Sequence, residues 1–577
     1  MRIGLLTEGG YPYVNGEGGL WCDRLVRGLG QHEFDVYAFS RGEAQEDAGW
    51  VPLPPQVRRV RTAPLWTAED DGVVYGRRAR RRFSEHYGEL AAALCAAPDA
   101  ATPAPDAATP APDAATPAPD AATPAADSPA PEADRFTTAL HGLAELAHDE
   151  GGLVAALRSE TAVRALERAC RAPGTQRAAR EARVQDLLAV AAHLERALRP
   201  LSLDWYEEDG LGAVDLCHAA AGGAAALPGL LAHHFLGVPL LLTEYGVRLR
   251  THYLTRPDAP PAVRSLLAAF HGRLAAETYR RAVFVTPGNT HARRWQERCG
   301  ADRAKLRTVY PGLDATPFAE AGESPQSADP HTLVWAGRVE PAKDLVSLLH
   351  AFAAIRAEEP KTRLRIIGGP SGTEGAAYLG HCKALAAQLF PDEAAGPHAV
   401  GDNPVSFEEP GGPGSPADAC ADGAVTVLSS VVEGFPVGLI EAMLCGRATV
   451  STDVGAVVEV IGGTGLVVPP RNPRALAEAC VSLLRDPERR ARLGAAARAR
   501  ALELFTVEQN ISAFHGLYLQ IVARTPVRRP ALDGAGDPLP FASPAEARIP
   551  GHWTDPAPRA VPTWATDAPV PATETAR

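Results

Sequence analysis

Short apolar runs alternate with glycine-rich loops and helical stretches along most of this 577-residue chain. The first apolar run covers 2–7 and stops at Glu8-Gly9-Gly10. A helical stretch follows over 20–30, and a second short strand is predicted over 34–39. Strand, glycine loop, helix and strand in this order are the opening of a parallel α/β sheet.

The alternation continues as two series of strands. The first series adds strands at 214–218, 239–243, 282–286 and 306–310. The second has strands at 332–337, 363–368, 424–429, 448–452 and 465–468, with helices at 342–358, 376–390, 438–446 and 473–485, and a helical end at 487–523. This pattern predicts an α/β protein with two doubly wound, Rossmann-like parallel sheets, which bind ligands at the carboxyl ends of their strands.

Two segments interrupt the alternation. Residues 98–125 are four copies of Pro-Asp-Ala-Ala-Thr-Pro-Ala, in which two prolines per copy forbid a continuous helix. Residues 135–200, rich in Ala, Leu, Arg and Glu, are predicted to be helices inserted into the first domain. The expected organisation is an N-terminal domain at 1–97 and 135–314, a disordered spacer at 98–134, a C-terminal domain at 315–525 and a disordered tail at 526–577.

Composition narrows the class of protein. The net charge of −12 and the pI near 5.8 argue against a binder of nucleic acid or anionic membrane that works through bulk charge. Nine cysteines without Cys-x-x-Cys or ligand spacing indicate reduced thiols. The N-terminus turns polar too early for a signal peptide, and no apolar run reaches the ~18–20 residues of a membrane span. We therefore expect a cytoplasmic enzyme.

The most specific motif is Glu433-Gly434-Phe435-Pro436-Val437-Gly438-Leu439-Ile440-Glu441, which follows a strand and opens a helix. Pro436 suits the first turn, where unpaired backbone N–H groups can bind an anion. Glu433 precedes the helix and Glu441 lies roughly 7 Å along its axis, so both carboxylates can face one ligand. In the alternative interpretation neither residue binds a ligand: Glu433 is a solvated acid of the loop, and Glu441 is an acid near the helix start that the helix dipole stabilises.

A second motif, Gly337-Arg338-Val339-Glu340-Pro341-Ala342-Lys343-Asp344, also lies between a strand and a helix. Its guanidinium and ammonium groups, five residues apart, can both reach a diphosphate at the helix start. The alternative is an exposed Arg and Lys on a solvated turn.

Weaker signals lie in the first half of the chain. The loop from Glu8-Gly9-Gly10 to Glu17-Gly18-Gly19 allows close backbone approach to a phosphate or sugar, but it does not read G-x-G-x-x-G. His218 follows a strand and either donates to a substrate hydroxyl or is a structural residue. No strand ends in Asp-x-Asp, so we predict no metal.

These motifs resemble those of the retaining glycosyltransferases of family 4, which have the two-Rossmann GT-B fold and an E-x7-E pattern that Glu433 and Glu441 match. The resemblance covers most of 1–525 and is strongest over 332–523. The N-terminal Thr7-Glu8-Gly9-Gly10-Tyr11-Pro12-Tyr13, with Gly18-Gly19-Leu20-Trp21, is more similar still to the Pel exopolysaccharide glycosyltransferase subgroup, which the helical insertion also fits.

The resemblance implies a role for each matching residue. A UDP-sugar, with UDP-glucose the expected donor, would bind the C-terminal domain, and a saccharide acceptor the N-terminal domain. Arg338 and Lys343 would bind the diphosphate, Glu441 the ribose hydroxyls, and Glu433 the donor sugar or the reacting face.

In the N-terminal domain the resemblance implies that the Gly18-Gly19 loop approaches the phosphates and that His218 is a donor-sugar ligand. Tyr245 stands where the subgroup usually has His, and Tyr310-Pro311-Gly312 lacks the usual Asn. The expected catalytic residues are Glu433, Arg338, Lys343 and His218. The expected donor-binding residues are Gly18, Gly19, Arg338, Lys343, Gly434, Phe435, Pro436, Val437 and Glu441.

The implied reaction is retaining hexosyl transfer in exopolysaccharide or glycan synthesis, without a cofactor, because the UDP-sugar is a substrate. Positive groups and the helix N-terminus near Pro436 would stabilise the leaving diphosphate. A membrane synthase complex is a candidate partner, and no nucleic acid is expected. Two alternatives stay open: a non-catalytic nucleotide-sugar-binding assembly subunit and a GT-B epimerase.

Overall fold

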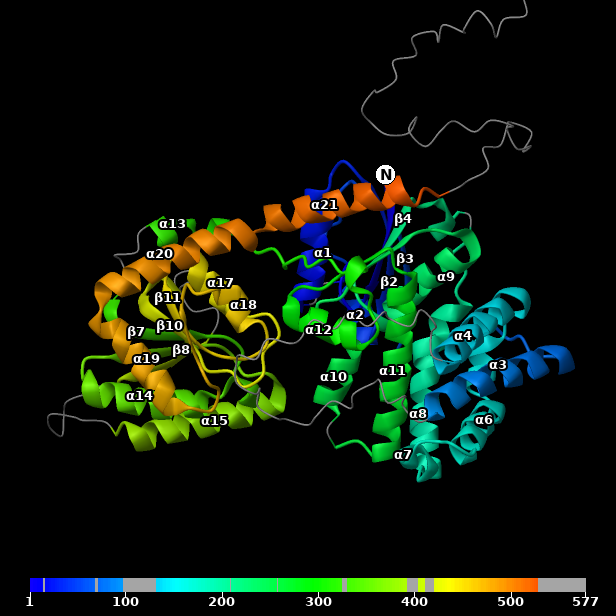
Figure 1. Ribbon diagram of the computed structural model, residues 1–577, viewed down its shortest axis with the longest axis horizontal. Coiled ribbons are helices and arrows are strands. Elements are labelled where there is room, and N and C mark those ends of the chain that lie inside the picture. The colour runs from blue at the N-terminus through cyan, green and yellow to red at the C-terminus, as the bar shows by residue number, and fades with distance from the viewer. Residues whose placement is uncertain are drawn as a thin grey trace, which may run out of the picture. The chain divides into compact units, whose positions relative to one another are not determined.

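The computed structural model describes residues 1–13, 16–67, 71–96, 131–207, 209–256, 258–323, 329–391, 403–409 and 420–527. Residues 1–525 contain two parallel six-stranded sheets (Figure 1), in the orders β3-β2-β1-β4-β5-β6 and β12-β11-β10-β7-β8-β9. Each is the 3-2-1-4-5-6 order of a doubly wound sheet, so the predicted pair of Rossmann-like sheets is confirmed. In each sheet the strand order reverses between the first and fourth strands, β1 and β4 or β7 and β10.

The twelve strands are short and mostly buried. They are β1 (Arg2–Glu8), β2 (Glu33–Ser40), β3 (Val57–Pro64), β4 (Leu216–Ala219), β5 (Leu240–Thr243), β6 (Phe284–Thr286), β7 (Asp329–Ala336), β8 (Arg363–Ile367), β9 (Val405–Glu408), β10 (Gly423–Leu428), β11 (Ala448–Thr452) and β12 (Leu466–Val468). In the first sheet Ile3 pairs with Phe34 and Leu216, and in the second Leu333 pairs with Leu364 and Val425. Continuous apolar runs are typical of central parallel strands, because helices cover both faces of the sheet.

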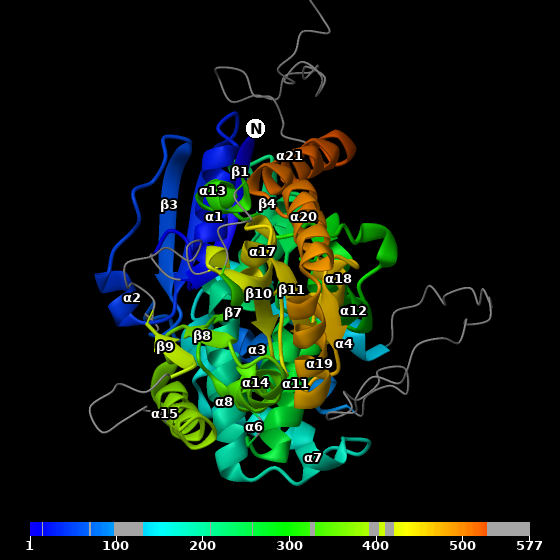
Figure 2. The same ribbon diagram turned by 90° about the vertical axis from the view of Figure 1, so that its left-hand side faces the viewer.

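Helices pack on both sheets. Around the first lie α1 (Gly16–Gly28), α2 (Glu43–Asp47), α9 (Leu227–Leu236), α10 (Arg248–Thr255), α11 (Pro261–Arg281) and α12 (Thr290–Arg298). The second half has α13 (Ala319–Glu323), α14 (Leu345–Glu358), α15 (Gly372–Leu389), α17 (Val437–Leu444), α18 (Val457–Ile461), α19 (Pro473–Arg485), α20 (Pro487–Leu504) and α21 (Val507–Arg524). Helices α17, α19 and α20 lie against β11 (Figure 2).

The insertion is a group of helices that pack on one another (Figure 1). They are α3 (Arg77–Cys95), α4 (Pro131–Glu150), α5 (Leu153–Leu157), α6 (Glu160–Arg171), α7 (Arg177–Arg180) and α8 (Val184–Leu198). The group thus includes α3, which precedes the repeat, and α4 begins inside the predicted spacer. The repeat at 98–125 and residues 528–577 of the predicted tail lie outside the described residues.

Helix α21 packs into the core of the first sheet, although it follows the second sheet in sequence. Its Phe514 and Tyr518 are fully buried in the cluster that holds Ile3, Leu5 and Trp21. The Trp21 indole Nε1–H donates to Asn510 Oδ1 at 3.1 Å. Helix α21 therefore completes the core of the first sheet, while the predicted domain limits themselves stay predictions.

The predicted strand at 306–310 is wrong. Leu306 alone forms a bridge, to Val285, because β6 ends at Thr286 and the next residue is Pro287, which has no N–H for the ladder. Strands β3 and β9 were not predicted, since both are edge strands with partly exposed, polar sequences. None of the helices in the described ranges has the length and apolar content that a membrane span requires.

Candidate functional site

The predicted donor residues of the second half gather where the strand order of the second sheet reverses. The segment after β7 lies against the segment after β10 at the carboxyl ends of these strands. The Val431 N–H donates to the Ala342 carbonyl at 2.9 Å, and the Ser429 hydroxyl donates to the Lys343 carbonyl at 2.7 Å. This is the crevice where open α/β sheets bind their ligands.

Lys343 and Glu433 form an ion pair in this crevice. The Lys343 Nζ lies 2.5 Å from Glu433 Oε2, and the two side chains are only 14% and 12% exposed. The Ser430 hydroxyl donates to the same oxygen at 3.2 Å, and the Gly434 N–H donates to Glu433 Oε1 at 3.2 Å. These contacts fix the position of the carboxylate, and the ammonium group of Lys343 is its ion-pair partner.

Lys343 lies just before α14, not inside the predicted helix at 342–358. Residues Pro341–Lys343 form a 3₁₀ turn, and Asp344 follows with φ 47° and ψ 52°. This left-handed conformation is tolerated by Asp, whose Oδ1 accepts from the Ser347 N–H at 3.2 Å and caps α14. The turn directs Lys343 to the β10 loop instead of along the helix.

Helix α17 carries Glu441 in its second turn, and Pro436 is the N-cap residue. A Cβ atom on Gly438 would lie 3.9 Å from Glu441 Oε2 and 3.3 Å from the carbonyl oxygen of Ala336, the last residue of β7. The Glu441 carboxylate thus folds back toward the helix start and the end of β7. This position suits a contact with a ligand in the crevice.

Gly455 holds the Glu433 loop from the other side. A Cβ at this position, with φ +58°, would lie 2.3 Å from the Glu433 carbonyl oxygen, so only glycine allows this approach. The Ala456 N–H donates to the Gly434 carbonyl at 3.2 Å. The Phe435 ring stacks on Tyr310, with ring centroids 6.3 Å apart.

Arg338 follows β7 and is exposed. Its guanidinium makes no ion pair or hydrogen bond with the part of the chain that the structure describes, so it is available to a ligand. The structure thus brings Lys343 and Glu433 together and places Arg338 and Glu441 on the same two loop–helix segments. The donor-binding and catalytic roles of these residues stay predictions.

His218 lies in β4 and is fully buried. Its Nδ1 pairs with the Tyr518 hydroxyl and its Nε2 with the Thr243 hydroxyl, both at 2.7 Å. Burial lowers the pKa of His218 to about 3, so the ring is neutral. Because protein groups occupy both nitrogens, this geometry favours the structural interpretation of His218 over contact with a donor sugar.

Gly18 and Gly19 lie in the first turn of α1, not in the loop before it as predicted. A Cβ on Gly19 would lie 3.4 Å from the Tyr11 nitrogen and 3.6 Å from the Tyr13 oxygen, so the loop after β1 packs on the helix start. Gly18 is exposed, with open space around its Cβ position. Of the two, Gly18 is the one open to a ligand.

Sequence reasoning missed an ionic network at the carboxyl end of the first sheet. Glu8, the last residue of β1, pairs with Arg248 and, at 3.0 Å, with Arg41. Burial would raise the pKa of Glu8, but the two guanidinium groups outweigh burial and lower it. Glu244 is buried and accepts from the Tyr279 hydroxyl at 2.5 Å; burial raises its pKa. The sequence signal that could have indicated this network is a charged residue directly after a predicted strand, as in Glu8-Gly9-Gly10 and in Thr243-Glu244-Tyr245-Gly246-Val247-Arg248.

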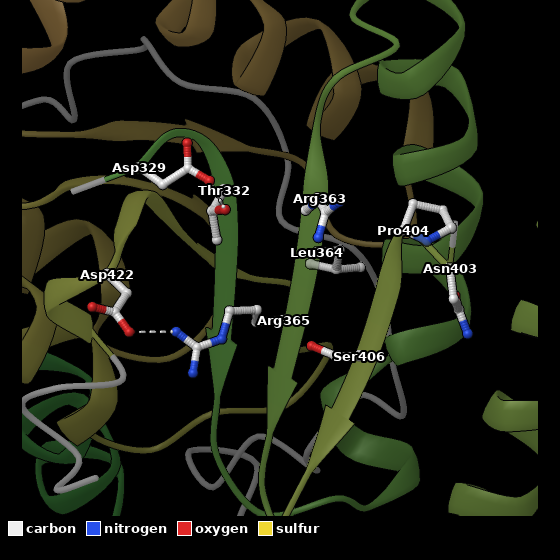
Figure 3. Close-up of a pocket in the computed structure, with 9 residues that line it drawn as sticks. All are labelled: Asp329, Thr332, Arg363, Leu364, Arg365, Asn403, Pro404, Ser406 and Asp422. Carbon is white, nitrogen blue, oxygen red and sulfur yellow. Dashed lines mark hydrogen bonds and ion pairs between the residues drawn. The ribbon is translucent and has the colours of Figure 1, made fainter. Parts of the chain in front are cut away.

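A separate cavity of about 380 Å³ opens at the amino ends of the strands of the second sheet (Figure 3). Its Arg365 already pairs with Asp422 at 2.8 Å and with Glu408 at 2.7 Å. Since the predicted donor residues lie at the opposite ends of these strands, this cavity is not the candidate site.

Two family models match the chain. Residues 1–304, more than half of the chain, match the family described as "Domain of unknown function (DUF3492)". Residues 330–486 match "Glycosyl transferases group 1". The second match contains Arg338, Lys343, Glu433 and Glu441 as well as the predicted Gly434–Val437 loop, so the predicted site residues of the second half all lie in the segment that matches this glycosyltransferase model.

Curated relatives are similar over part of their length. The chain is 32% identical over 223 residues to a D-inositol 3-phosphate glycosyltransferase of Kineococcus radiotolerans, which covers 35% of this chain and 49% of the relative. It is 29% identical over 293 residues to the enzyme of the same name from a Nocardioides species, which covers 48% of this chain and 62% of the relative. The matches thus span about half to three fifths of these relatives.

Solved structures share the fold. A structure of Anabaena Alr3699/HepE in complex with UDP has a TM-score of 0.50 at 14% identity and covers 90% of this chain and 99% of that chain. Sucrose-phosphate synthase from Thermosynechococcus elongatus has a TM-score of 0.51 at 16% identity and covers 91% of this chain and 100% of that chain. Together with the two parallel sheets, these likenesses confirm the predicted GT-B fold.

Proposed function

We propose that this chain, which belongs to the family described as "Domain of unknown function (DUF3492)", is a retaining glycosyltransferase that moves a hexose from a UDP-sugar to a saccharide acceptor. The observation that carries the proposal is the Lys343–Glu433 pair at the reversal point of the second sheet, inside the segment that matches the glycosyltransferase group 1 model. We take glucose as the sugar and exopolysaccharide synthesis as the process, following the sequence resemblance to the Pel subgroup.

The donor would lie across the two loops of the crevice. Its diphosphate would contact Arg338 and Lys343, its ribose Glu441, and its sugar Glu433. Breaking the anomeric bond builds negative charge on the diphosphate and positive charge on the sugar ring. Fixed groups of opposite charge lower the barrier most when they are positioned before the reaction, as the hydrogen-bonded Glu433 carboxylate is.

Lys343 has two competing partners in this scheme. Without a ligand its ammonium neutralises Glu433 at 2.5 Å. A bound diphosphate would draw the ammonium away and leave the Glu433 carboxylate to face the sugar. Donor binding and exposure of the catalytic carboxylate would therefore be coupled.

The comparisons support this reaction class. Curated relatives carry the name glycosyltransferase, and one solved protein of the same fold was crystallised with UDP. The buried free thiols fit a reducing cytoplasm, where we place the reaction. We further propose that the reaction needs no metal, because the leaving diphosphate already has two cationic side chains.

The test is a screen of nucleotide sugars by thermal shift, followed by UDP release measured with and without saccharide acceptors and by the mass and anomeric configuration of the product. The proposal predicts a product heavier than the acceptor by one hexose, with the anomeric configuration of the donor retained. An epimerised nucleotide sugar without any acceptor would support the epimerase alternative. Binding without turnover would support the assembly subunit.

A further inference from the structure

We infer that Arg250 and Glu459 are positioning residues that attach the Glu433 loop, residues 433–436, to the first half of the chain. Arg250 acts on the loop directly, and Glu459 acts through the turn and the ring that pack against it. The inference rests on the proposed function, in which the Glu433 carboxylate faces the donor sugar. It makes the position of this carboxylate depend on residues that precede the segment matched by the glycosyltransferase model.

The Glu433 loop connects β10 to α17 and depends on other elements for its position. Its residues lie outside any helix or strand. The Gly434 N–H donates to the Glu433 side chain at 3.2 Å, and open space surrounds the Cβ position of Gly434. Accurate placement matters here, because a displacement of about 1 Å from the productive geometry can lower a rate about 100-fold.

Arg250 reaches this loop from α10, the helix that follows β5 of the first sheet. Its half-buried guanidinium donates from Nη2 to the Glu433 carbonyl oxygen at 3.3 Å. The start of α10 is itself anchored, because Arg248 pairs with Glu8 at the end of β1. The ionic network of the first sheet thus holds the helix from which Arg250 contacts the second sheet.

Glu459, on α18, makes the second attachment. Its Oε2 accepts from the Thr290 N–H at 2.7 Å and from the Thr290 hydroxyl at 2.6 Å, and its Oε1 accepts from the Tyr310 hydroxyl at 2.8 Å. Thr290 is the first residue of α12, so the carboxylate lies at a helix N-terminus, where negative charge is favoured. Three charge-assisted hydrogen bonds therefore attach α18 to the first half of the chain.

The contacts of α18 lead back to the Glu433 loop. Helix α18 directly follows Ala456, whose N–H donates to the Gly434 carbonyl at 3.2 Å. The Tyr310 ring, whose hydroxyl binds Glu459, stacks on Phe435 with ring centroids 6.3 Å apart. The two attachments therefore act on successive residues of the same loop.

Breaking either attachment should displace the carboxylate and keep the nucleotide contacts, because the residues that we propose for the nucleotide all belong to the second half. We expect Arg250→Met and Glu459→Gln each to lower kcat at least about 10-fold, with UDP affinity by calorimetry within about twofold of the parent. Arg250→Lys keeps a donor for the carbonyl oxygen, so it should recover part of the lost turnover.

Matched variants separate these effects from a general loss of stability. Arg474 and Glu478 form an exposed ion pair within α19, so Arg474→Met and Glu478→Gln should turn over like the parent. Tyr310→Phe removes the hydroxyl that Glu459 binds and keeps the ring on Phe435. It should lower kcat in the same direction as Glu459→Gln without the loss of a charge.

Hydrogen exchange without ligand measures the loop independently of turnover. The N–H groups of Gly434 and Ala456 should exchange about 10-fold faster in Arg250→Met and Glu459→Gln than in the parent, with exchange in β7 unchanged. Exchange and kcat like those of the parent would overturn the inference. A loss of UDP affinity equal to the loss of kcat would also overturn it, because the two residues would then belong to the nucleotide site. A parent protein that transfers no hexose would contradict the proposed function, while the exchange rates would still test the attachments.

Discussion

Replacing Glu433 with glutamine separates its structural role from its catalytic one. The substitution keeps the shape of the side chain and removes the charge that Lys343 neutralises at 2.5 Å. Exposed ion pairs contribute about 0–1 kcal/mol, whereas breaking a fully buried pair costs about 3–5 kcal/mol. With side chains 14% and 12% exposed, the pair lies between these limits, and we expect Glu433→Gln to lower the free energy of unfolding by roughly 1–3 kcal/mol.

The effect on ligand binding should have the opposite sign. Lys343, no longer held by a carboxylate, would be free to contact the diphosphate, so UDP affinity should be kept or increased. The catalytic effect should be large, because the charge facing the developing oxocarbenium ion is lost: kcat should fall about 10²–10³-fold. Calorimetric titration with UDP, thermal unfolding and steady-state kinetics measure the three quantities on one preparation.

Lys343→Met is the matched control. It removes the other half of the pair and should weaken UDP binding while lowering stability by a similar amount. The double variant should be less destabilised than the sum of the single changes, with a coupling free energy of about 0.5–3 kcal/mol. The reasoning is refuted if Glu433→Gln abolishes UDP binding yet keeps kcat, or if the coupling is zero.

Four further outcomes are expected. Arg338→Ala should lower kcat about 10²–10³-fold and weaken UDP binding, since the diphosphate persists in the product; normal kinetics and UDP affinity would place the diphosphate elsewhere. Glu441→Gln should raise KM more than it lowers kcat, because the ribose does not change during the reaction; a pure kcat effect would contradict this. His218, with a pKa of about 3 in the folded protein, binds a proton below pH 6.5 only after unfolding, so stability should fall by roughly 2 kcal/mol between pH 6.5 and 5 and less in His218→Gln; unchanged pH dependence with a 100-fold loss of kcat would instead indicate a catalytic histidine. Deleting two of the four repeats at 98–125 should leave turnover unchanged, as loop length has a small entropic effect; loss of cooperative unfolding would show a structural role.

Much of the fold follows from local sequence because central parallel strands are buried on both faces. The strands β1, β7 and β10 can be recognised from their apolar sequences alone, without knowing which strands they pair with. Edge strands such as β3 and β9 lack this signal, since water faces one side and their sequences stay polar. The two motifs of the candidate site could be found from the sequence because each directly follows an apolar strand, and the structure shows that these two strands are neighbours at the reversal point.

Contacts between distant segments were not predictable. The Glu8–Arg248 pair joins residues 240 positions apart, and no sequence pattern around either residue indicates its partner. The packing of α21 on the core of the first sheet, where Tyr518 contacts His218, could not be predicted either. The sequence of an amphipathic helix indicates which face is buried but not which element covers that face. The place of His218 after a strand left a ligand role and a structural role open, and only the family resemblance implied a ligand role. Its actual environment depends on a helix 300 residues away.

The most direct test of the donor site is a crystal structure of the protein with UDP. The account predicts phosphate oxygens within about 2.7–3.2 Å of the Arg338 and Lys343 nitrogen atoms, and ribose hydroxyls at hydrogen-bond distance from Glu441. It also predicts that Lys343 has moved from Glu433 toward the diphosphate. UDP bound at the first sheet, or bound at the second sheet without contact to Arg338 and Lys343, would contradict the account.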